Sequence, residues 1–189
     1  MRPSKREILL DTAERLFYSD GFHATGIDRI VNEAGIARMT LYNHFESKEA
    51  LVEAVLVHRY TRYLDDLGSA VDGAAPGGAL AALTDVHCHW LETVSDRGCI
   101  VIRAIAEFEQ HHPPIADAGR RLKDELLAVI RRAVELDGLR DPDDTGTRIL
   151  VALEGSDTLV PVIGAAEAVR HARAIVSAVA DTAMKEVQA

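Results

Sequence analysis

The chain has 189 residues, of which 48% are hydrophobic and 27% charged, and its formal net charge is −9. This length suits one domain, or a small domain fused to a larger one, and it allows a sizeable core. It has no uncharged apolar run near the ~20 residues of a membrane helix, and residues 1–11 lack the apolar segment of a secretory signal. We therefore expect a cytoplasmic protein without a membrane span, with Cys88 and Cys99 reduced rather than joined in a disulfide.

Hydrophobic periodicity and helix-end signals predict an all-α chain of about nine helices. Ser4 and Glu7 have the spacing of a capping box, so the first helix should begin at Ser4. Ser47 should cap a long fourth helix that reaches about Leu67, and residues 68–78 should form a loop. The first helix should end at residue 20. The other expected helices are one following residue 25 and then 38–45, 79–95, 99–110, 115–136, 143–164 and 166–187.

Residues 25–48 contain two short helical patterns joined at Gly35, a residue that can adopt the left-handed backbone of a tight helix exit. In the second pattern Leu41 and Phe45 lie four apart and should face inward. The opposite face carries hydroxyl, amide and imidazole groups, on Thr40, Asn43 and His44. Such groups suit a groove lined with phosphates and base edges. The pattern predicts a helix-turn-helix; the alternative is an ordinary helical hairpin, which the weak helix formers on the outer face disfavour.

The residues around this motif form a longer pattern: Ala13-Glu14-Arg15-Leu16-Phe17, Gly21-Phe22, Thr25, Ile30, Ala34-Gly35-Ile36, Thr40-Leu41-Tyr42-Asn43-His44-Phe45 and Ser47-Lys48-Glu49-Ala50-Leu51. In this pattern the stretch from Lys5 to Val55 resembles the TetR family of bacterial repressors. The resemblance implies an N-terminal three-helix DNA-binding domain at residues 1–47, extending through the fourth helix to about residue 64. It also implies a C-terminal helical effector-binding and dimerisation domain at residues 65–189.

The resemblance further implies a transcriptional repressor that binds a palindromic operator as a homodimer through its third helix and is released by a small-molecule effector. The expected DNA contacts are Thr25, Arg29, Arg38, Met39, Thr40, Tyr42, Asn43, His44 and Lys48. Tyr42 and Lys48 match phosphate contacts of the family, although Tyr42 could instead pack against the first helix. Gly26 stands where relatives often have Thr or Ser, which leaves Thr25 and Arg29 as substitutes for a phosphate-binding hydroxyl.

The charge is divided unevenly along the chain. Residues 1–64 carry no net charge and residues 65–189 carry −9, so the excess acid lies outside the predicted DNA-binding part. Dimerisation is expected because one short helix reads too few base pairs, whereas two copies reach successive major grooves. The last helix has a stripe that could form the pairing face or an internal core face: Ala168, Ala172, Ile175, Val176, Val179 and Ala183. The resemblance favours an interface built from the eighth and ninth helices.

The resemblance also implies a ligand pocket between the fourth and eighth helices, with His87, Trp90, Ile102, Arg103, Phe108, Glu154 and Asp157 as candidate lining residues. Arg103 lies in a helix that is apolar all round and needs a partner, either Glu107 one turn on or an acidic ligand. Glu154 and Asp157 share a face, where they could meet a cationic ligand, pair across the dimer or face solvent.

Other functions find little support in the sequence. His87 and His89 point about 200° apart on a helix and cannot share one ion, so no metal site is expected. Thiol oxidation is not expected either, because the sequence places nothing strongly basic near the cysteines. No nucleophile–base pair or phosphate-binding glycine motif predicts an enzyme, and no cofactor is expected. The remaining alternative is a DNA-binding or architectural protein that a protein partner controls without a small effector.

Overall fold

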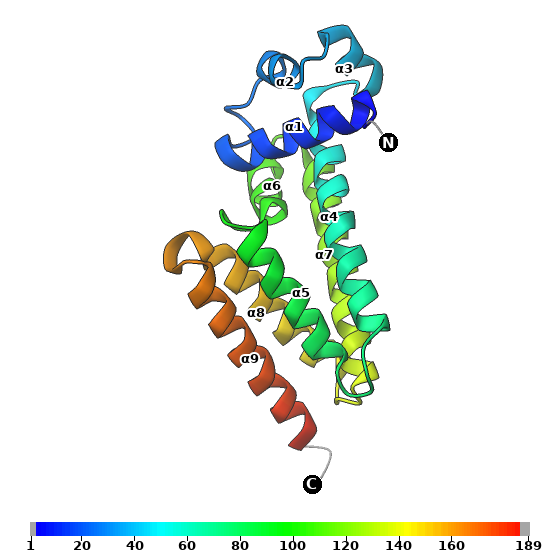
Figure 1. Ribbon diagram of the computed structural model, residues 1–189, viewed down its shortest axis with the longest axis vertical. Helices are drawn as coiled ribbons and strands as arrows, with labels where there is room; N and C mark the ends of the chain where they lie inside the picture. Colours follow the sequence, from blue (N-terminus) through cyan, green and yellow to red (C-terminus); the bar gives the residue numbers. More distant parts are fainter. Residues whose placement is uncertain (1–2, 186–189) are drawn as a thin grey trace. The chain divides into compact units, whose positions relative to one another are not determined.

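The structure, a computed structural model, describes residues 3–185 of the chain. These residues form nine α-helices and no strand (Figure 1), so the all-α prediction is confirmed. The helices are α1 (Lys5–Asp20), α2 (Ile27–Ala34), α3 (Arg38–His44), α4 (Lys48–Asp72), α5 (Ala79–Thr93), α6 (Ile100–Phe108), α7 (Pro113–Leu136), α8 (Pro142–Ile163) and α9 (Ala165–Lys185). Within the described residues, no helix is both long enough and apolar enough to cross a membrane.

The two predicted helix caps are confirmed. The Ser4 hydroxyl accepts a hydrogen bond from the backbone N–H of Glu7 at 3.2 Å, and the Glu7 carboxylate accepts one from the Ser4 N–H at 2.6 Å. The Ser47 hydroxyl accepts from the N–H of Ala50 at 3.1 Å, at the start of α4. Because the first N–H groups of a helix have no partner inside the helix, these side chains fix where α1 and α4 begin.

Several helix ends differ from the prediction. The fourth helix does not stop near Leu67 but continues to Asp72, because Leu67 and Val71 lie one turn apart and are both buried. The predicted loop therefore shortens to residues 73–78. α7 begins at Pro113 rather than at residue 115, since proline is tolerated in the first turn of a helix. The predicted end of the last helix, at residue 187, lies outside the described residues.

The chain divides into two compact units, one made of residues 1–61 and 100–122 and the other of residues 62–99 and 123–189. The first unit contains α1, α2, α3 and α6, and its aromatic core is centred on Phe22. The Phe22 ring lies 5.4 Å, between centroids, from the rings of both Phe17 and Phe108. α6, which is remote in sequence, thus belongs to the same compact unit as the N-terminal helices.

The first unit also contains a buried ion pair between α1 and α4. Arg59 donates to the carboxylate of Glu14 at 2.7 Å, with side-chain exposures of 6% and 11%. The Arg59 guanidinium lies 4.5 Å from the ring centroid of Tyr18, which adds a cation–π contact. A buried charge is tolerated only when it is paired, so this contact fixes how α1 packs on the first half of α4.

The second unit is dominated by the antiparallel pair α8 and α9, which lie side by side (Figure 1). Leu91 of α5, Val160 of α8 and Ala168 of α9 form a buried cluster there. The predicted stripe on the last helix mostly faces this interior, because Ala168, Ala172, Val176 and Ala183 are buried within the protomer. The core alternative therefore holds for these four residues, whereas Ile175 of the same stripe is 47% exposed.

Gly119 of α7 marks a close helix contact inside the first unit. A Cβ atom at Gly119 would lie 2.6 Å from Cγ1 of Ile105. We expect Gly119→Ala to be less stable than Gly68→Ala by about 1–3 kcal/mol in urea unfolding, since overpacking a helix contact is destabilising. Gly68 is the matched control, because it lies inside α4 with nothing within 4 Å of an added Cβ. Equal stability of the two variants would contradict the close packing of α6 and α7.

Candidate nucleic-acid interface

The α2–α3 turn has the geometry that the sequence predicts. Gly35 has φ +65°, and its N–H and that of Ile36 bond to the carbonyls of Asn32 and Val31 at 3.3 and 3.0 Å. A residue with a Cβ is strained in this left-handed conformation, so glycine permits the tight exit from α2. The turn lets α3 start at Arg38, only four residues after α2 ends.

The inner face of α3 is anchored by two side chains. Leu41 is fully buried and Phe45, just past the helix end, is 4% exposed. These anchors fix the rotation of α3 and leave its other face outside. Met39 is 71% exposed and Tyr42 38% exposed. Asn43 and His44 are also exposed and Thr40 is half-buried, so the structure brings these predicted site residues to one surface.

Arg38 is held over this exposed face. Its guanidinium donates to Asp28 at 2.8 Å and lies 5.7 Å from the centroid of the Tyr42 ring. The interaction with Tyr42, and after it the charge of Asp28, raise the pKa of Arg38, which therefore stays charged. Both contacts are at the surface, so Arg38 can exchange Asp28 for a phosphate or a base edge at little cost.

Arg29 differs from Arg38 because it belongs to a network of surface charges. It bonds to Asp20 at 2.6 Å and to Glu33 at 3.0 Å, and Arg15 also bonds to Glu33 at 2.6 Å. Hydrogen bonds from Arg15 and then Arg29 lower the pKa of Glu33, so the carboxylate remains negative. Arg29 is thus paired with two acids, whereas Arg38 is paired with one, so less of the Arg29 charge is available to a further anion.

Thr25 has no free side-chain group to offer to DNA. It is fully buried, and its hydroxyl donates to the carbonyls of Leu16 at 3.3 Å and Gly21 at 2.9 Å. Thr25 therefore ties the α1–α2 connection together, and the expectation that its hydroxyl contacts a phosphate does not fit its buried position. Gly26 stands at the N-cap of α2 without a side-chain hydrogen bond, as the missing hydroxyl implies.

The start of α4 follows α3 closely in the sequence. Lys48 is the first residue of α4 and is half-buried. Helix N-termini favour anions because their N–H groups are free and the helix dipole is positive there. Lys48 and the first turn of α4 therefore have the chemistry of a phosphate contact.

The ligand candidates of the first unit make contacts inside the protein. Arg103 donates to the carbonyl of Tyr18 at 3.2 Å, while Glu107 pairs with His23 at 3.1 Å. Each member of the expected Arg103–Glu107 pair thus has a different partner. Phe108 belongs to the aromatic core described above, and Ile102 is 39% exposed.

The ligand candidates of the second unit lie in a polar cluster. The buried imidazole of His87 bonds to the Tyr63 hydroxyl at 2.7 Å and to Ser156 at 3.1 Å. Since the Ser156 hydroxyl donates to the Leu153 carbonyl, His87 Nε2 is the donor to Ser156 and Nδ1 accepts from Tyr63. The Trp90 ring lies 5.1 Å from the Tyr63 ring, between centroids.

The two acids of α8 also have bonding partners inside the protomer. Asp157 accepts from the Ser95 hydroxyl at 2.6 Å, and Glu154 pairs with Lys123 at 2.6 Å. Lys123 also lies 3.1 Å from the sulfur of Cys99, so the expectation that nothing strongly basic lies near a cysteine was wrong. Burial alone would lower the pKa of Lys123, but Cys99 and Glu154 raise it.

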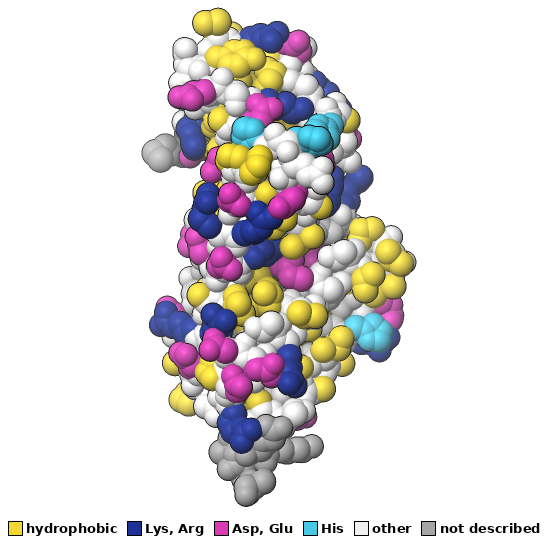
Figure 2. Space-filling view, turned by 180° about the vertical axis from the view of Figure 1, so that it is seen from behind, with side chains coloured by type: hydrophobic (Ala, Val, Ile, Leu, Met, Phe, Trp, Pro, Cys, Tyr) yellow, Lys and Arg dark blue, Asp and Glu magenta, His cyan; other side chains and the backbone are white. Residues whose placement is uncertain are grey.

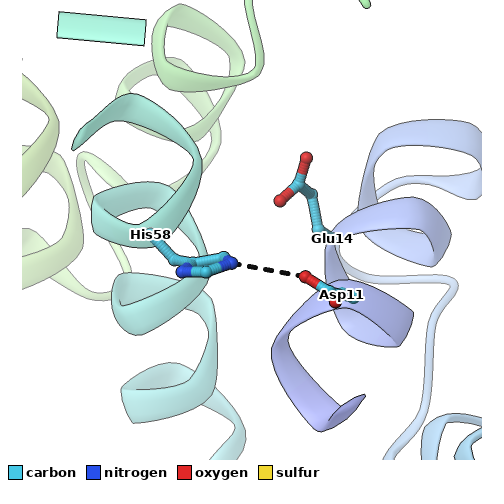
Figure 3. Close-up of side chains that lie close together, drawn as sticks. All are labelled: Asp11, Glu14 and His58. Carbon is cyan, nitrogen blue, oxygen red and sulfur yellow. Dashed lines mark hydrogen bonds and ion pairs between the residues drawn. The ribbon is translucent and has the colours of Figure 1, made fainter. Parts of the chain in front are cut away.

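One group in the described part of the chain has the donor types of a metal site, namely Asp11, Glu14 and His58 (Figure 3). His58 and Asp11 point toward each other, with Nε2 and Oδ1 3.3 Å apart. Glu14, however, is bonded to the Arg59 guanidinium, whose positive charge opposes a cation at this place. We read the group as a polar link between α1 and α4.

A seven-residue helix with an exposed polar face, set by a tight turn behind α2, defines a DNA-binding helix-turn-helix protein. Comparison with known proteins agrees. Residues 9–55 match the model of bacterial regulatory proteins of the tetR family, and residues 76–176 match that of the tetracyclin repressor-like C-terminal domain. Because the second match alone covers more than half of the chain, the chain belongs to the TetR family. These are transcriptional regulators and not enzymes.

Individual relatives match to different extents. The transcriptional activator FasR of Mycolicibacterium smegmatis is 41% identical over 70 residues, which are 37% of this chain and 30% of FasR. The regulator LmrA of Bacillus subtilis is 25% identical over 157 residues, 79% of this chain and 82% of LmrA. SCO4454, a TetR-family regulator from Streptomyces coelicolor, is 26% identical in its crystal structure, with a TM-score of 0.87 over 95% of both chains. The chain spans about a third of the length of the curated relatives that it matches at higher identity.

His87 makes the stability of the protein depend on pH. Burial, and then the charge of Lys123, lower its pKa to about 4 from an ordinary 6.5. Below about pH 6.5 the imidazole of the unfolded chain takes up a proton while that of the folded protein stays neutral. The free energy of unfolding should therefore decrease as the pH is lowered, by up to about 1.4 kcal/mol per pH unit. His87→Gln cannot titrate, and urea unfolding between about pH 5 and pH 6 should show a correspondingly shallower slope. Identical slopes in the wild type and the variant would contradict the neutral, buried imidazole.

Proposed function

We propose that this protein is a homodimeric transcriptional repressor that binds a palindromic operator through α3 of each protomer and is released by a small-molecule effector. It acts in the cytoplasm, where its DNA lies. The observation that carries the proposal is the exposed face of α3, which Leu41 and Phe45 hold outward. The first unit supplies the DNA-binding helix α3. The match of residues 76–176 to the tetracyclin repressor-like C-terminal domain supports an effector-binding role for the second unit.

In this proposal the exposed face divides into two kinds of contact. Tyr42 and Lys48 bind phosphates and set the register, because a phenol and an ammonium group are ordinary phosphate donors. Arg38, Asn43 and His44 contact the hydrogen-bonding groups of the base edges, and Thr40 and Met39 lie beside them. Arg29 makes a weaker contact to a phosphate. The apolar side chain of Met39 suits a thymine methyl group.

Dimerisation is proposed through a face of α8 and α9, called here the pairing face, with exposed side chains at Val151, Leu159, Val162, Ile163 and Ile175. On α8 these residues recur at the spacing of one helix face. Figure 2 shows hydrophobic side chains gathered where α8 turns into α9. Contiguous exposed apolar side chains of this kind mark an association surface. Four residues of the α9 stripe singled out from the sequence are buried inside the protomer and are therefore left out of this pairing face, namely Ala168, Ala172, Val176 and Ala183.

The effector acts in this proposal by shifting populations. Suppose that a ligand binds the second unit more tightly in the dimer whose two α3 helices have the wrong spacing for the operator. Such a ligand lowers the fraction of protein that can bind the operator. Two recognition helices must lie about 34 Å apart to enter successive major grooves on one side of the duplex, so a modest change in spacing suffices.

The proposed DNA contacts are tested on an operator selected by the wild-type protein from random duplexes, which we expect to be palindromic. Lys48→Ala should weaken binding about tenfold and reduce the salt dependence by about one counterion, whereas Tyr42→Phe should weaken it a few-fold. Fluorescence anisotropy at several salt concentrations measures both effects. The control is Arg132→Ala, which removes the same charge from an exposed site on α7 in the other unit. Sequence-independent binding by the wild type would overturn the proposal.

The pairing face is tested by placing a charge in it. Leu159→Asp and Val151→Asp should convert a dimer of 20.6 kDa chains into monomers, since association would bury an unpaired carboxylate. Light scattering after size exclusion gives the mass, and circular dichroism checks that the helices remain. Val57→Asp, at a 42% exposed apolar position on α4, is the control and should stay dimeric. A wild type that is monomeric at every concentration would refute the pairing.

A further inference from the structure

The second unit has a pocket that sequence reasoning did not indicate. It has a volume of about 350 Å³ and lies between the first turns of α5 and the second half of α9. The turn between α7 and α8 closes one side with Leu139. Small-molecule sites in proteins begin at about this volume. None of the ligand candidates chosen from the sequence lines it.

The pocket is hollow because small side chains face each other where α5 and α9 meet. Ala81 comes from α5, and Ser177 and Ala180 come from α9. The walls behind them are apolar and well packed, since Leu80 and Val176 are each 4% exposed. A compact apolar group that enters the pocket would displace water from this preformed apolar wall, which favours binding.

The charges around the pocket favour a cation. Arg173 of α9 is paired with Asp85 of α5 at the rim, and both side chains are substantially exposed. Asp137 also lines the pocket, where it accepts from the N–H groups of Ala79 and Leu80 at 2.8 and 2.9 Å. The lining thus holds two carboxylates and one guanidinium. An ionised carboxylate offers about four acceptor sites, so Asp85 can accept from a ligand while still bonded to Arg173.

The pocket stays accessible in the proposed dimer. On α9 the lining side chains of Arg173, Val176, Ser177 and Ala180 leave the helix within about 100° of one another. Ile175 of the pairing face leaves it about 150° from the middle of that sector. A partner seated on the Ile175 side would therefore not cover the pocket.

We propose that this pocket binds a cationic amphiphile, a small molecule with a compact apolar body and a primary amine. The apolar body packs between Leu80, Val176 and Ala180, and the ammonium group donates to Asp85. Calling this ligand the effector rests on the proposed function. Its binding does not, because the pocket lies wholly within the second unit.

The test is calorimetric titration of the full chain, without DNA, with three probes of equal length: phenylbutylamine, phenylbutanol and phenylbutyrate. The amine should bind at one site per chain and about tenfold more tightly than the carboxylate, with the alcohol between them. Asp85→Asn should remove the preference for the amine and leave the affinity for the alcohol unchanged.

A filled pocket provides the second arm. Ser177→Phe should abolish binding of all three probes, whereas Ser69→Phe, the same change at an exposed site on α4, should leave it intact. Circular dichroism establishes that both variants are folded. The proposal is overturned if the amine does not bind at millimolar concentration, if phenylbutyrate binds as well as the amine, or if Ser177→Phe still binds. Because no DNA is present, each of these failures is distinct from a failure of operator recognition.

Discussion

The burial of Leu41 and Phe45 is the constraint on which the exposed face of α3, the proposed DNA-binding surface, depends. A seven-residue helix is too short to be stable alone in water, so α3 exists because tertiary contacts hold its inner face. The same contacts fix its rotation, and rotation decides which side chains are presented. Gly35 positions the start of α3, since its left-handed backbone brings the chain directly from α2 into α3.

The elements that the sequence predicted well are those set by local chemistry. Ser4 with Glu7, Ser47 and Gly35 act on backbone groups within a few residues, so their roles follow from spacing alone. The end of α4 could not be found in this way. Gly68 is a weak helix former and suggested a stop, but burial of Val71 on the following turn outweighs that preference.

The sequence could not predict which residues pair with the buried polar groups of the second unit. Lys123 meets Cys99 and Glu154 across 24 and 31 residues of chain, and no short-range pattern encodes such a meeting. The two possible roles of the α9 stripe could not be separated from the sequence for a related reason. Alanine and valine at helical spacing fit a partner helix in the same protomer as well as one in another, and only the packing of α5 and α8 distinguishes them.

The buried pair of Arg59 and Glu14 has a consequence for how this chain can diverge. Loss of either partner leaves one uncompensated charge in a nearly dry contact, a state that typically costs 3–5 kcal/mol. A lineage that replaces one of the two must pass through that weakened intermediate before the second change arrives. Across homologues the two positions should therefore vary together, as an ion pair or as two apolar residues.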